Sequence, residues 1–143
     1  MLDGLIEERK RKLSNLKKEG IDPYPAEVRM TFPISEALQG FSPLSKKNKK
    51  VYLVGRVKAF RDQGGVLFFD IDDGKGKIQV VVKKENLKNF SLIKNNIDIG
   101  DFVEVSGPLF KTKRGEKSID GKSLRIIVKS LRPIPTDFYG LED

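Results

Sequence analysis

Hydrophobic and polar residues alternate along the middle of this sequence, and that period of two constrains the fold more than any other feature. The alternation occupies three successive stretches, 51–61, 66–73 and 77–84. The connections between them, DQGG and GKG, are short and rich in glycine. Alternation of this kind is typical of half-buried β-strands, and short glycine-containing connections favour antiparallel hairpins. The sequence therefore predicts a three-stranded antiparallel meander.

The residues that follow continue this pattern after one helical interruption. Residues 85–96 place Phe90 and Ile93 at helical spacing, and two further alternating stretches occupy 101–113 and 123–133. Three strands, a helix and two more strands is the order of the OB-fold, a small barrel whose strand 2–3 face and adjacent loops bind oligonucleotides. An SH3-like barrel is the alternative, but the long helix-containing connection counts against it.

Helices are predicted before the barrel. Residues 5–20 carry a narrow apolar stripe among charged residues, typical of a helix lying across a surface, with Gly20 as its C-terminal stop. ISEALQG predicts a short helix with Ser35 or Thr31 near its start and Gly40 near its end, and SKKNKK predicts a basic loop. The basic residues of the first helix could contact RNA or a partner subunit: Arg9, Lys10, Lys12, Lys17 and Lys18.

The composition narrows the functions open to this chain. Lys and Arg total 28 against 20 acidic residues, a net charge of +8 that favours a polyanionic partner, although a basic protein without such a partner fits equally well. The sequence has no cysteine and no histidine, which excludes thiol chemistry and the commonest general base and metal ligand. No apolar run approaches the length of a membrane span and no secretory signal begins the chain. We therefore expect a cytoplasmic protein with no membrane partner.

The doublet Phe68 and Phe69 decides which face of the second strand is buried. Neighbouring strand residues point to opposite faces, and Phe68 shares its face with Asp70 and Asp72. Two carboxylates are poorly suited to a barrel interior, so we expect Phe69 inside and Phe68 outside. The same alternation places two sets of residues inside, Leu67, Phe69 and Ile71, then Ile78, Val80 and Val82. It places outside Val66, Phe68, Asp70 and Asp72, then Lys77, Gln79, Val81 and Lys83.

An outward aromatic next to an outward amide suits an unstacked base. Phe68 would stack on the ring of the base, and Gln79 would hydrogen-bond its edge. Coverage of Phe68 by the N-terminal arm is the alternative. Asp70 and Asp72 do not complete a calcium-binding loop, and GKGK lacks the spacing of a phosphate loop. Phosphate contacts are possible in the two basic loops, at Lys46, Lys47, Lys49, Lys50, Lys111, Lys113 and Arg114.

These motifs together resemble the N-terminal anticodon-binding domain of the class II lysyl-tRNA synthetases, over essentially the whole chain. RKRKLSNLKKEGIDPYP is similar to the leading helix and the following turn of that family, and VGRVKAFRDQGGVLFFDIDDGKGKIQVVV is similar to its first three strands. DIGDFVEVSGPLFKTKRGEKSI and KSLRPIPTDFYGLED complete the resemblance. The aspartyl and asparaginyl synthetases share the barrel but lack the GIDPYP turn and the LRPIP…GL exit.

The resemblance implies a role for individual residues. Phe68 matches the aromatic on which the family stacks the middle anticodon base, a uridine, and Gln79 matches the amide that hydrogen-bonds it. Arg61 matches an arginine that contacts the same nucleotide, and Glu116 matches a glutamate beside the pocket. The alternatives are a general single-stranded nucleic-acid-binding OB domain and a non-catalytic interaction or regulatory fragment.

The resemblance also implies a longer parent protein. That parent is a homodimeric lysine–tRNA ligase that attaches lysine to tRNA through a lysyl-adenylate, and its ATP and Mg²⁺ bind in a catalytic domain downstream. This chain then has no catalytic residue, cofactor or metal of its own, and binds tRNA without charging it. We expect residues 1–50 to form the N-terminal helix and connecting arm, 51–135 the OB-fold anticodon-binding barrel, and 136–143 the start of a linker.

Overall fold

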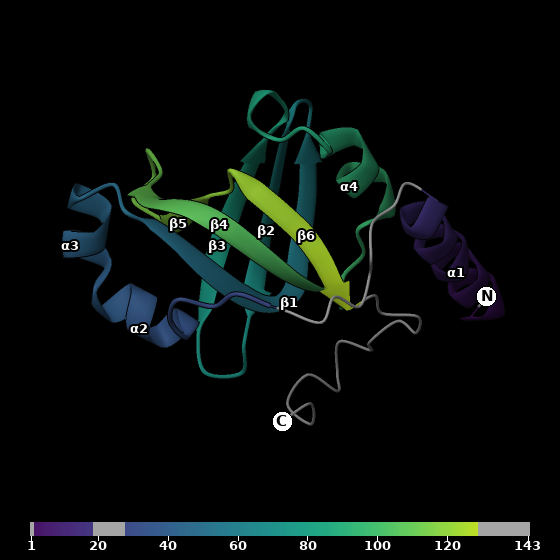
Figure 1. Cartoon of the computed structure of the whole chain (residues 1–143), viewed down its shortest axis with the longest axis horizontal. Coiled ribbons are helices and arrows are strands. Elements are labelled where there is room, and N and C mark those ends of the chain that lie inside the picture. The colour runs from purple at the N-terminus through teal and green to yellow at the C-terminus, as the bar shows by residue number, and fades with distance from the viewer. Residues whose placement is uncertain (1, 19–27, 129–143) are drawn as a thin grey trace.

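The computed structural model describes residues 2–18 and 28–128 of the chain. The described residues form four α-helices, one 3₁₀-helix and a single sheet (Figure 1). The helices are α1 (Leu2–Lys18), α2 (Ile34–Gln39), α3 (Phe41–Lys46), η1 (Lys84–Asn86) and α4 (Phe90–Asn96). The strands are β1 (Lys50–Gln63), β2 (Val66–Asp72), β3 (Lys77–Lys83), β4 (Phe102–Lys111), β5 (Lys117–Asp120) and β6 (Ser123–Val128).

Five of the strands close into a barrel, which confirms the predicted mainly β OB-fold class. They are hydrogen-bonded in the order β1-β2-β3-β5-β4, and β4 pairs with β1 to complete the ring. β1 closes the ring because its 14 residues are enough to pair with two strands, with Leu53 opposite Val105 on β4 and Val57 opposite Ile71 on β2. The pairing of β3 with β5 is parallel and the other pairings are antiparallel.

The strand that completes the barrel is β5, which the alternation pattern does not predict. The pattern predicts only the later stretch, which forms β6 and pairs with β4 alone. β5 pairs with the C-terminal part of β4, and β6 pairs with its N-terminal part. The chain that connects β5 to β6 passes close to Gly107 of β4. A Cβ at Gly107 would lie 1.8 Å from the carbonyl oxygen of Asp120, and its φ of +155° also favours glycine. The sequence pattern contains no sign of this close approach.

The core lies inside the barrel and is closed at one end by α4. Phe69 is 1% exposed, and its ring stacks on that of Phe60 with 6.1 Å between centroids. Phe90 and Ile93 turn from α4 into the same core, which confirms the capping helix predicted between the third and fourth strands. All six residues predicted to face inward from the second and third strands are buried.

The segment between α1 and the barrel differs from the prediction in two details. It forms two short helices, with Gly40 between them, where one is predicted. The backbone nitrogen of Ile34, at the start of α2, donates to Asp73 Oδ2 at 2.9 Å, so the β2–β3 hairpin caps this helix instead of Ser35 or Thr31. The predicted basic loop SKKNKK is shorter than expected because its first residues belong to α3 and its last begins β1.

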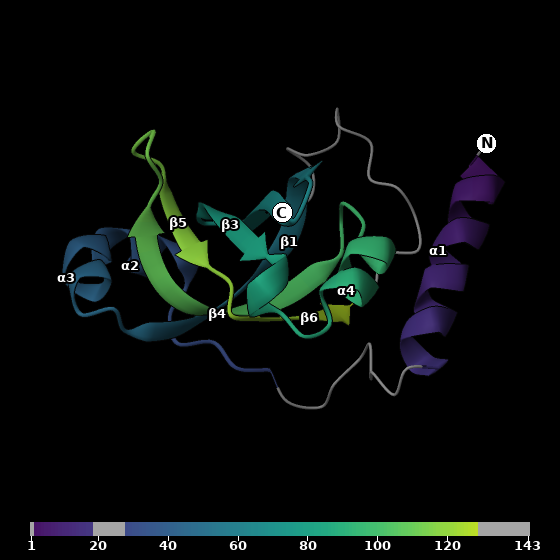
Figure 2. The same ribbon diagram turned by 90° about the horizontal axis from the view of Figure 1, so that it is seen from above.

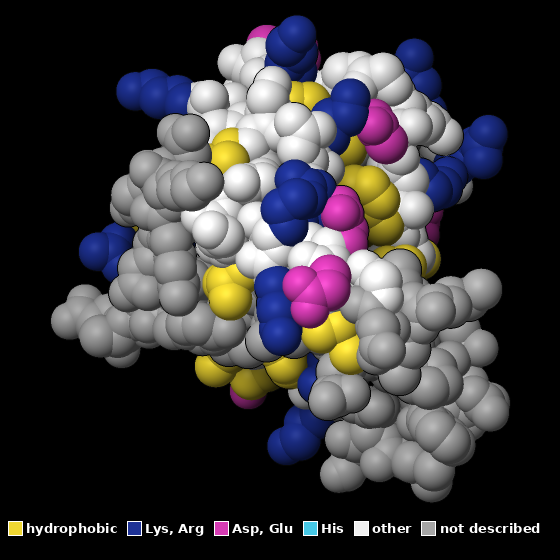
Figure 3. Space-filling view, turned by 90° about the vertical axis from the view of Figure 1, so that its right-hand side faces the viewer, with side chains coloured by type: hydrophobic (Ala, Val, Ile, Leu, Met, Phe, Trp, Pro, Cys, Tyr) yellow, Lys and Arg dark blue, Asp and Glu magenta, His cyan; other side chains and the backbone are white. Residues whose placement is uncertain are grey.

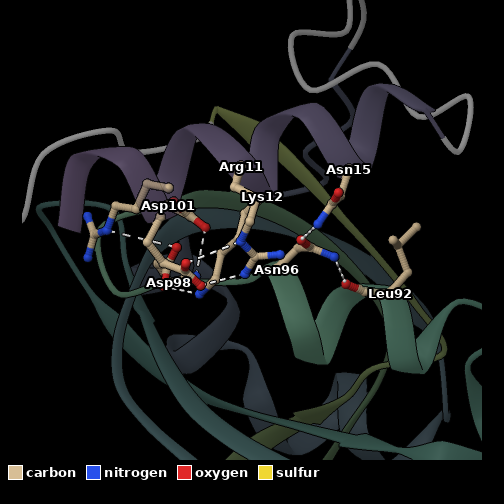
Figure 4. A network of polar contacts seen from close by, with 9 residues as sticks. Arg11, Lys12, Asn15, Leu92, Asn96, Asp98 and Asp101 are labelled. Carbon is tan, nitrogen blue, oxygen red and sulfur yellow. Dashed lines mark hydrogen bonds and ion pairs between the residues drawn. The ribbon is translucent and has the colours of Figure 1, made fainter. Parts of the chain in front are cut away.

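The first helix lies against α4, across one end of the barrel, as its narrow apolar stripe predicts (Figures 1 and 2). The contact is partly ionic: Lys12 Nζ lies 2.6 Å from Asp98 Oδ1, and Arg9 Nε lies 3.8 Å from Oδ2 of the same residue (Figure 4). Asn15 Nδ2 donates to Asn96 Oδ1 at 3.4 Å. Arg9 and Lys12, two of the five basic residues proposed to contact RNA or a partner, therefore hold the helix on the barrel.

The face on which α1 lies is not uniformly basic. Acidic side chains stand among the lysines and arginines there, with small apolar areas between them (Figure 3). On the helix itself, Arg11 pairs with Glu8 at 2.5 Å and Lys10 pairs with Glu7 at 3.9 Å. Gly20 and residues 129–143, which include the expected linker, lie outside the described residues.

Candidate nucleic-acid interface

The outer face of the barrel across β1, β2, β3 and β5 carries two parallel rows of side chains. Residues that are paired in register lie side by side on the same face. The first row, which we call the aromatic row, is Arg61, Phe68, Val81 and Asp120. The second, which we call the polar row, is Lys58, Asp70, Gln79 and Ser118. Three of the four predicted anticodon-binding residues therefore lie on one surface.

A β-bulge places Arg61 on this face. Strict alternation from the inward Val57 would send Phe60 outward and Arg61 inward. The pairing of β1 with β2 shifts between Lys58 and Arg61, and Ala59 adopts φ of +53°, so the strand carries one extra residue. Phe60 consequently packs on the core and Arg61 lies opposite Phe68.

Phe68 is half-buried on the outer face, as predicted, and Arg61 covers part of it. The guanidinium carbon of Arg61 lies 5.2 Å from the centre of the Phe68 ring, within the range of a cation–π contact. Arg61 itself is exposed.

Gln79 lies on the expected face but is not open to solvent. Only 6% of the residue is exposed, and Val81 on the same face is 4% exposed, which corrects the expectation of an open outer surface on β3. The reason is position: β3 lies between β2 and β5, so neighbouring side chains cover it from both sides. The register also places Gln79 opposite Asp70, and therefore diagonal to Phe68.

Glu116 reaches Gln79 from the hairpin between β4 and β5. With its amide nitrogen turned toward the carboxylate, Gln79 donates to Glu116 Oε2 at 2.5 Å and to Oε1 at 3.3 Å. The hairpin holds Glu116 in place through Thr112, whose Oγ1 accepts from the Glu116 backbone nitrogen at 3.1 Å. Glu116 thus belongs to the same site as the other three predicted residues, although no periodicity of the sequence connects it to them.

Asp70 belongs to this site too, although no nucleic-acid contact is predicted for it from the sequence. Burial raises the pKa of its carboxyl group, with Glu116 and Asp72 adding to the rise and Lys77 and Arg61 opposing it. Its nearest cation is Lys77, whose Nζ lies 4.0 Å from Asp70 Oδ2. The position of Asp70 directly opposite Gln79 identifies it as part of the site. Finding this position from the sequence requires the register of the β2–β3 hairpin to be known.

The two basic loops lie at one end of the barrel, opposite α1 (Figures 1 and 2). They come together because Lys50, at the start of β1, pairs with Pro108 near the end of β4. The candidate phosphate contacts at this end are exposed: Lys46, Lys47, Lys49, Lys50, Lys111, Lys113 and Arg114. Lys50 also lies over the ring of Tyr52, with its Nζ 5.1 Å from the centroid. This end of the molecule is therefore strongly positive.

Within residues 2–18 and 28–128, no helix is both long enough and apolar enough to cross a membrane.

Comparison with known proteins agrees with this geometry. The lysine–tRNA ligase 2 of Methanosarcina mazei is 38% identical over 92% of this chain and 26% of its own length. The lysine–tRNA ligase of Carboxydothermus hydrogenoformans is 38% identical over 99% of the chain and 29% of its length, and that of Aliarcobacter butzleri is 35% identical over 96% and 29%. The chain thus spans less than a third of the length of these curated relatives. Residues 51–134 match the tRNA anti-codon family, so the chain belongs to this family of OB-fold nucleic acid binding domains.

Proposed function

We propose that this domain binds the anticodon of lysine tRNA and recognises its middle uridine. The observation that carries the proposal is the convergence of Arg61, Phe68, Gln79 and Glu116 from β1, β2, β3 and the β4–β5 hairpin. A stacking ring, a cation, a buried amide and a carboxylate together supply what an unpaired base requires. The choice of lysine tRNA in this proposal is supported by the similarity of the chain to lysine–tRNA ligases.

Each residue has a distinct part in this proposal. Phe68 stacks on the uracil ring, a contact typically worth about 1–3 kcal/mol per base. Gln79 donates to a carbonyl of the base, and Glu116 holds its amide in that orientation. The Arg61 guanidinium, which covers the Phe68 ring in the free domain, moves to the nucleotide when the base takes its place. The basic loops bind the phosphates.

The parent protein is part of the same proposal. We place this domain in a cytoplasmic, homodimeric class II lysine–tRNA ligase that forms lysyl-adenylate, with ATP and Mg²⁺ bound outside the present chain. Anticodon binding would orient the tRNA so that its 3′ end reaches that active site. The domain alone is then expected to bind tRNA without aminoacylating it.

Binding of short RNA hairpins tests the proposal. A hairpin with the loop anticodon UUU and one with UCU differ only at the middle base, and their affinities for the domain can be compared by isothermal titration calorimetry at about 0.15 M salt, where long-range screening is strong. We expect the UUU hairpin to bind about 5- to 150-fold more tightly, since one mismatched contact typically costs about 1–3 kcal/mol. A steep loss of affinity with added salt is expected for both hairpins because phosphates contribute.

The other outcomes identify the alternatives. Equal affinities for the two hairpins would contradict anticodon recognition and leave a general single-stranded nucleic-acid-binding domain. Absence of measurable RNA binding at low salt would indicate an interaction or regulatory domain whose barrel face meets protein.

A further inference from the structure

Asp70 is a carboxylate at the candidate site to which the proposed function assigns no role. It lies on the polar row directly opposite Gln79 and two residues from Phe68 on the same face. Directly paired residues on one face have Cβ atoms about 4.5–5.5 Å apart, and diagonal neighbours remain within reach of long side chains. A base stacked on Phe68 with its edge toward Gln79 therefore also meets Asp70.

The contacts of Asp70 leave its oxygens available. Among the described residues, the carboxylate accepts no hydrogen bond, and its ion pair with Lys77 is long, at 4.0 Å, to a lysine whose side chain is 61% exposed. Glu116 and Asp120, two further carboxylates on this face, are different. Glu116 accepts from the Gln79 amide, and Asp120 pairs with Lys122 at 3.3 Å. The Asp70 side chain is only 24% exposed, so it is poorly solvated as well as poorly paired. Such an acceptor gains more from a donor on a ligand than a solvated one does.

Uracil and cytosine differ at the atom that a carboxylate reads best. The central atom of the uracil edge, N3, carries a hydrogen, with the carbonyl acceptors O2 and O4 on either side. In cytosine, N3 is an acceptor and the exocyclic amine replaces O4. A carboxylate facing N3 therefore accepts a hydrogen bond from uracil and repels the lone pair of cytosine, while amide donors beside it serve the carbonyl groups.

We propose that Asp70 determines specificity for the middle base by accepting a hydrogen bond from N3–H of uracil. The inference rests on the proposed anticodon function and extends it with a residue that excludes cytosine. Arg61 and Gln79 donate to the two carbonyl groups of the base. Asp70 lies on β2, the strand between those that carry the two donors, and directly opposite Gln79 in the polar row. The neighbouring cations Arg61 and Lys77 reduce the repulsion between this carboxylate and the RNA backbone.

The substitution Asp70→Asn tests this role with little change in volume. Its amide can accept from uracil N3–H or, after rotation, donate to cytosine N3, so discrimination should be lost without loss of stacking. A hydrogen bond to a charged group is worth about 1.5–3 kcal/mol, so the ratio of UUU to UCU affinity should fall by about 10- to 100-fold. The matched control is Asp72→Asn on the same strand and face, two residues farther from Phe68 than Asp70, which should leave the ratio unchanged.

The possible results separate the inference from the function on which it rests. If the unchanged domain prefers UUU and Asp70→Asn keeps that preference, the role of Asp70 is wrong and anticodon recognition stands. If the unchanged domain shows no preference, both fail. Equal weakening of both hairpins, reproduced by a 2′-deoxyuridine at the middle position, would assign Asp70 to the ribose hydroxyl and overturn base reading. Thermal melting of each variant confirms that it is folded, and Asp70→Glu, which keeps a carboxylate, should retain part of the preference.

Discussion

Arg61 lies over the ring of Phe68, with its guanidinium carbon 5.2 Å from the ring centre. The contact depends on the bulge at Ala59, because strict alternation along β1 would place Arg61 inside the barrel. The stacking ring is therefore already occupied by a cation in the free domain. The guanidinium therefore covers part of the aromatic surface before RNA binds. When a base takes its place on the ring, the displaced guanidinium remains close to the bound nucleotide.

Phe68→Ala should remove the preference for the UUU hairpin while leaving the fold intact. The residue is half-buried on the outer face, so its loss opens no cavity in the core. We expect affinity for the UUU hairpin to fall by about 1–3 kcal/mol, the usual value of one base stack. Calorimetric titration measures the affinity, and Phe68→Tyr is the control because it retains a ring and should bind nearly as well as the unchanged domain.

Phe69→Ala, unlike Phe68→Ala, should destabilise the domain. Phe69 is 1% exposed and stacks on Phe60 in the core, and truncation of a buried phenylalanine typically costs about 3–5 kcal/mol. Urea denaturation followed by circular dichroism measures the free energy of unfolding. If Phe68→Ala unfolds the domain and Phe69→Ala does not, the assignment of the two faces of β2 is reversed.

The doublet also shows how far the sequence could predict the site. Asp70 and Asp72 were sufficient to assign the faces of β2, because a carboxylate inside an apolar barrel is too costly. The burial of Gln79 could not be predicted in this way, since it depends on β5 and on Glu116, which arrive from a distant part of the chain. The alternation pattern does not predict β5, because four residues are too few to show an alternation of apolar and polar side chains.

Ala59→Gly should stabilise the domain. Ala59 has φ of +53°, a left-handed conformation that costs a residue with a Cβ about 1–2 kcal/mol, and part of this cost is recovered when glycine replaces it. Because glycine also gains entropy in the unfolded chain, we expect a net gain of about 0.5–1 kcal/mol in the free energy of unfolding. Thermal and urea denaturation measure it.

The turn at Gly64 offers the reverse experiment. Gly64 has φ of +66° and open space around it, so Gly64→Ala adds conformational strain without a clash. It should destabilise the domain by about 1–2 kcal/mol.

A loss of stability in Ala59→Gly would show that the left-handed bulge is absent in solution, and the placement of Arg61 over Phe68 would then need another explanation.

Asp70→Asn should stabilise the domain at neutral pH, although it is expected to impair discrimination of the bases. Burial raises the pKa of Asp70 above its ordinary value of 3.8, so the folded state holds this proton more tightly than the unfolded state does. An acid of this kind costs stability increasingly as the pH rises above 3.8, the full cost is reached above its folded pKa, and the cost disappears as the pH falls below 3.8. The gain from Asp70→Asn should therefore be full at pH 7 and vanish in acid.

Urea denaturation of both proteins across this pH range measures the difference. The control Asp72→Asn disrupts a carboxylate that pairs with Lys58 at 3.7 Å and accepts from the Gly74 backbone nitrogen at 2.7 Å, so it should not stabilise the domain. A stability gain for Asp70→Asn that is the same at every pH would contradict the raised pKa. Under our proposal, the stability that Asp70 costs the free domain is offset by its contribution to recognition of the base in the complex. The titrations with RNA hairpins measure that contribution independently.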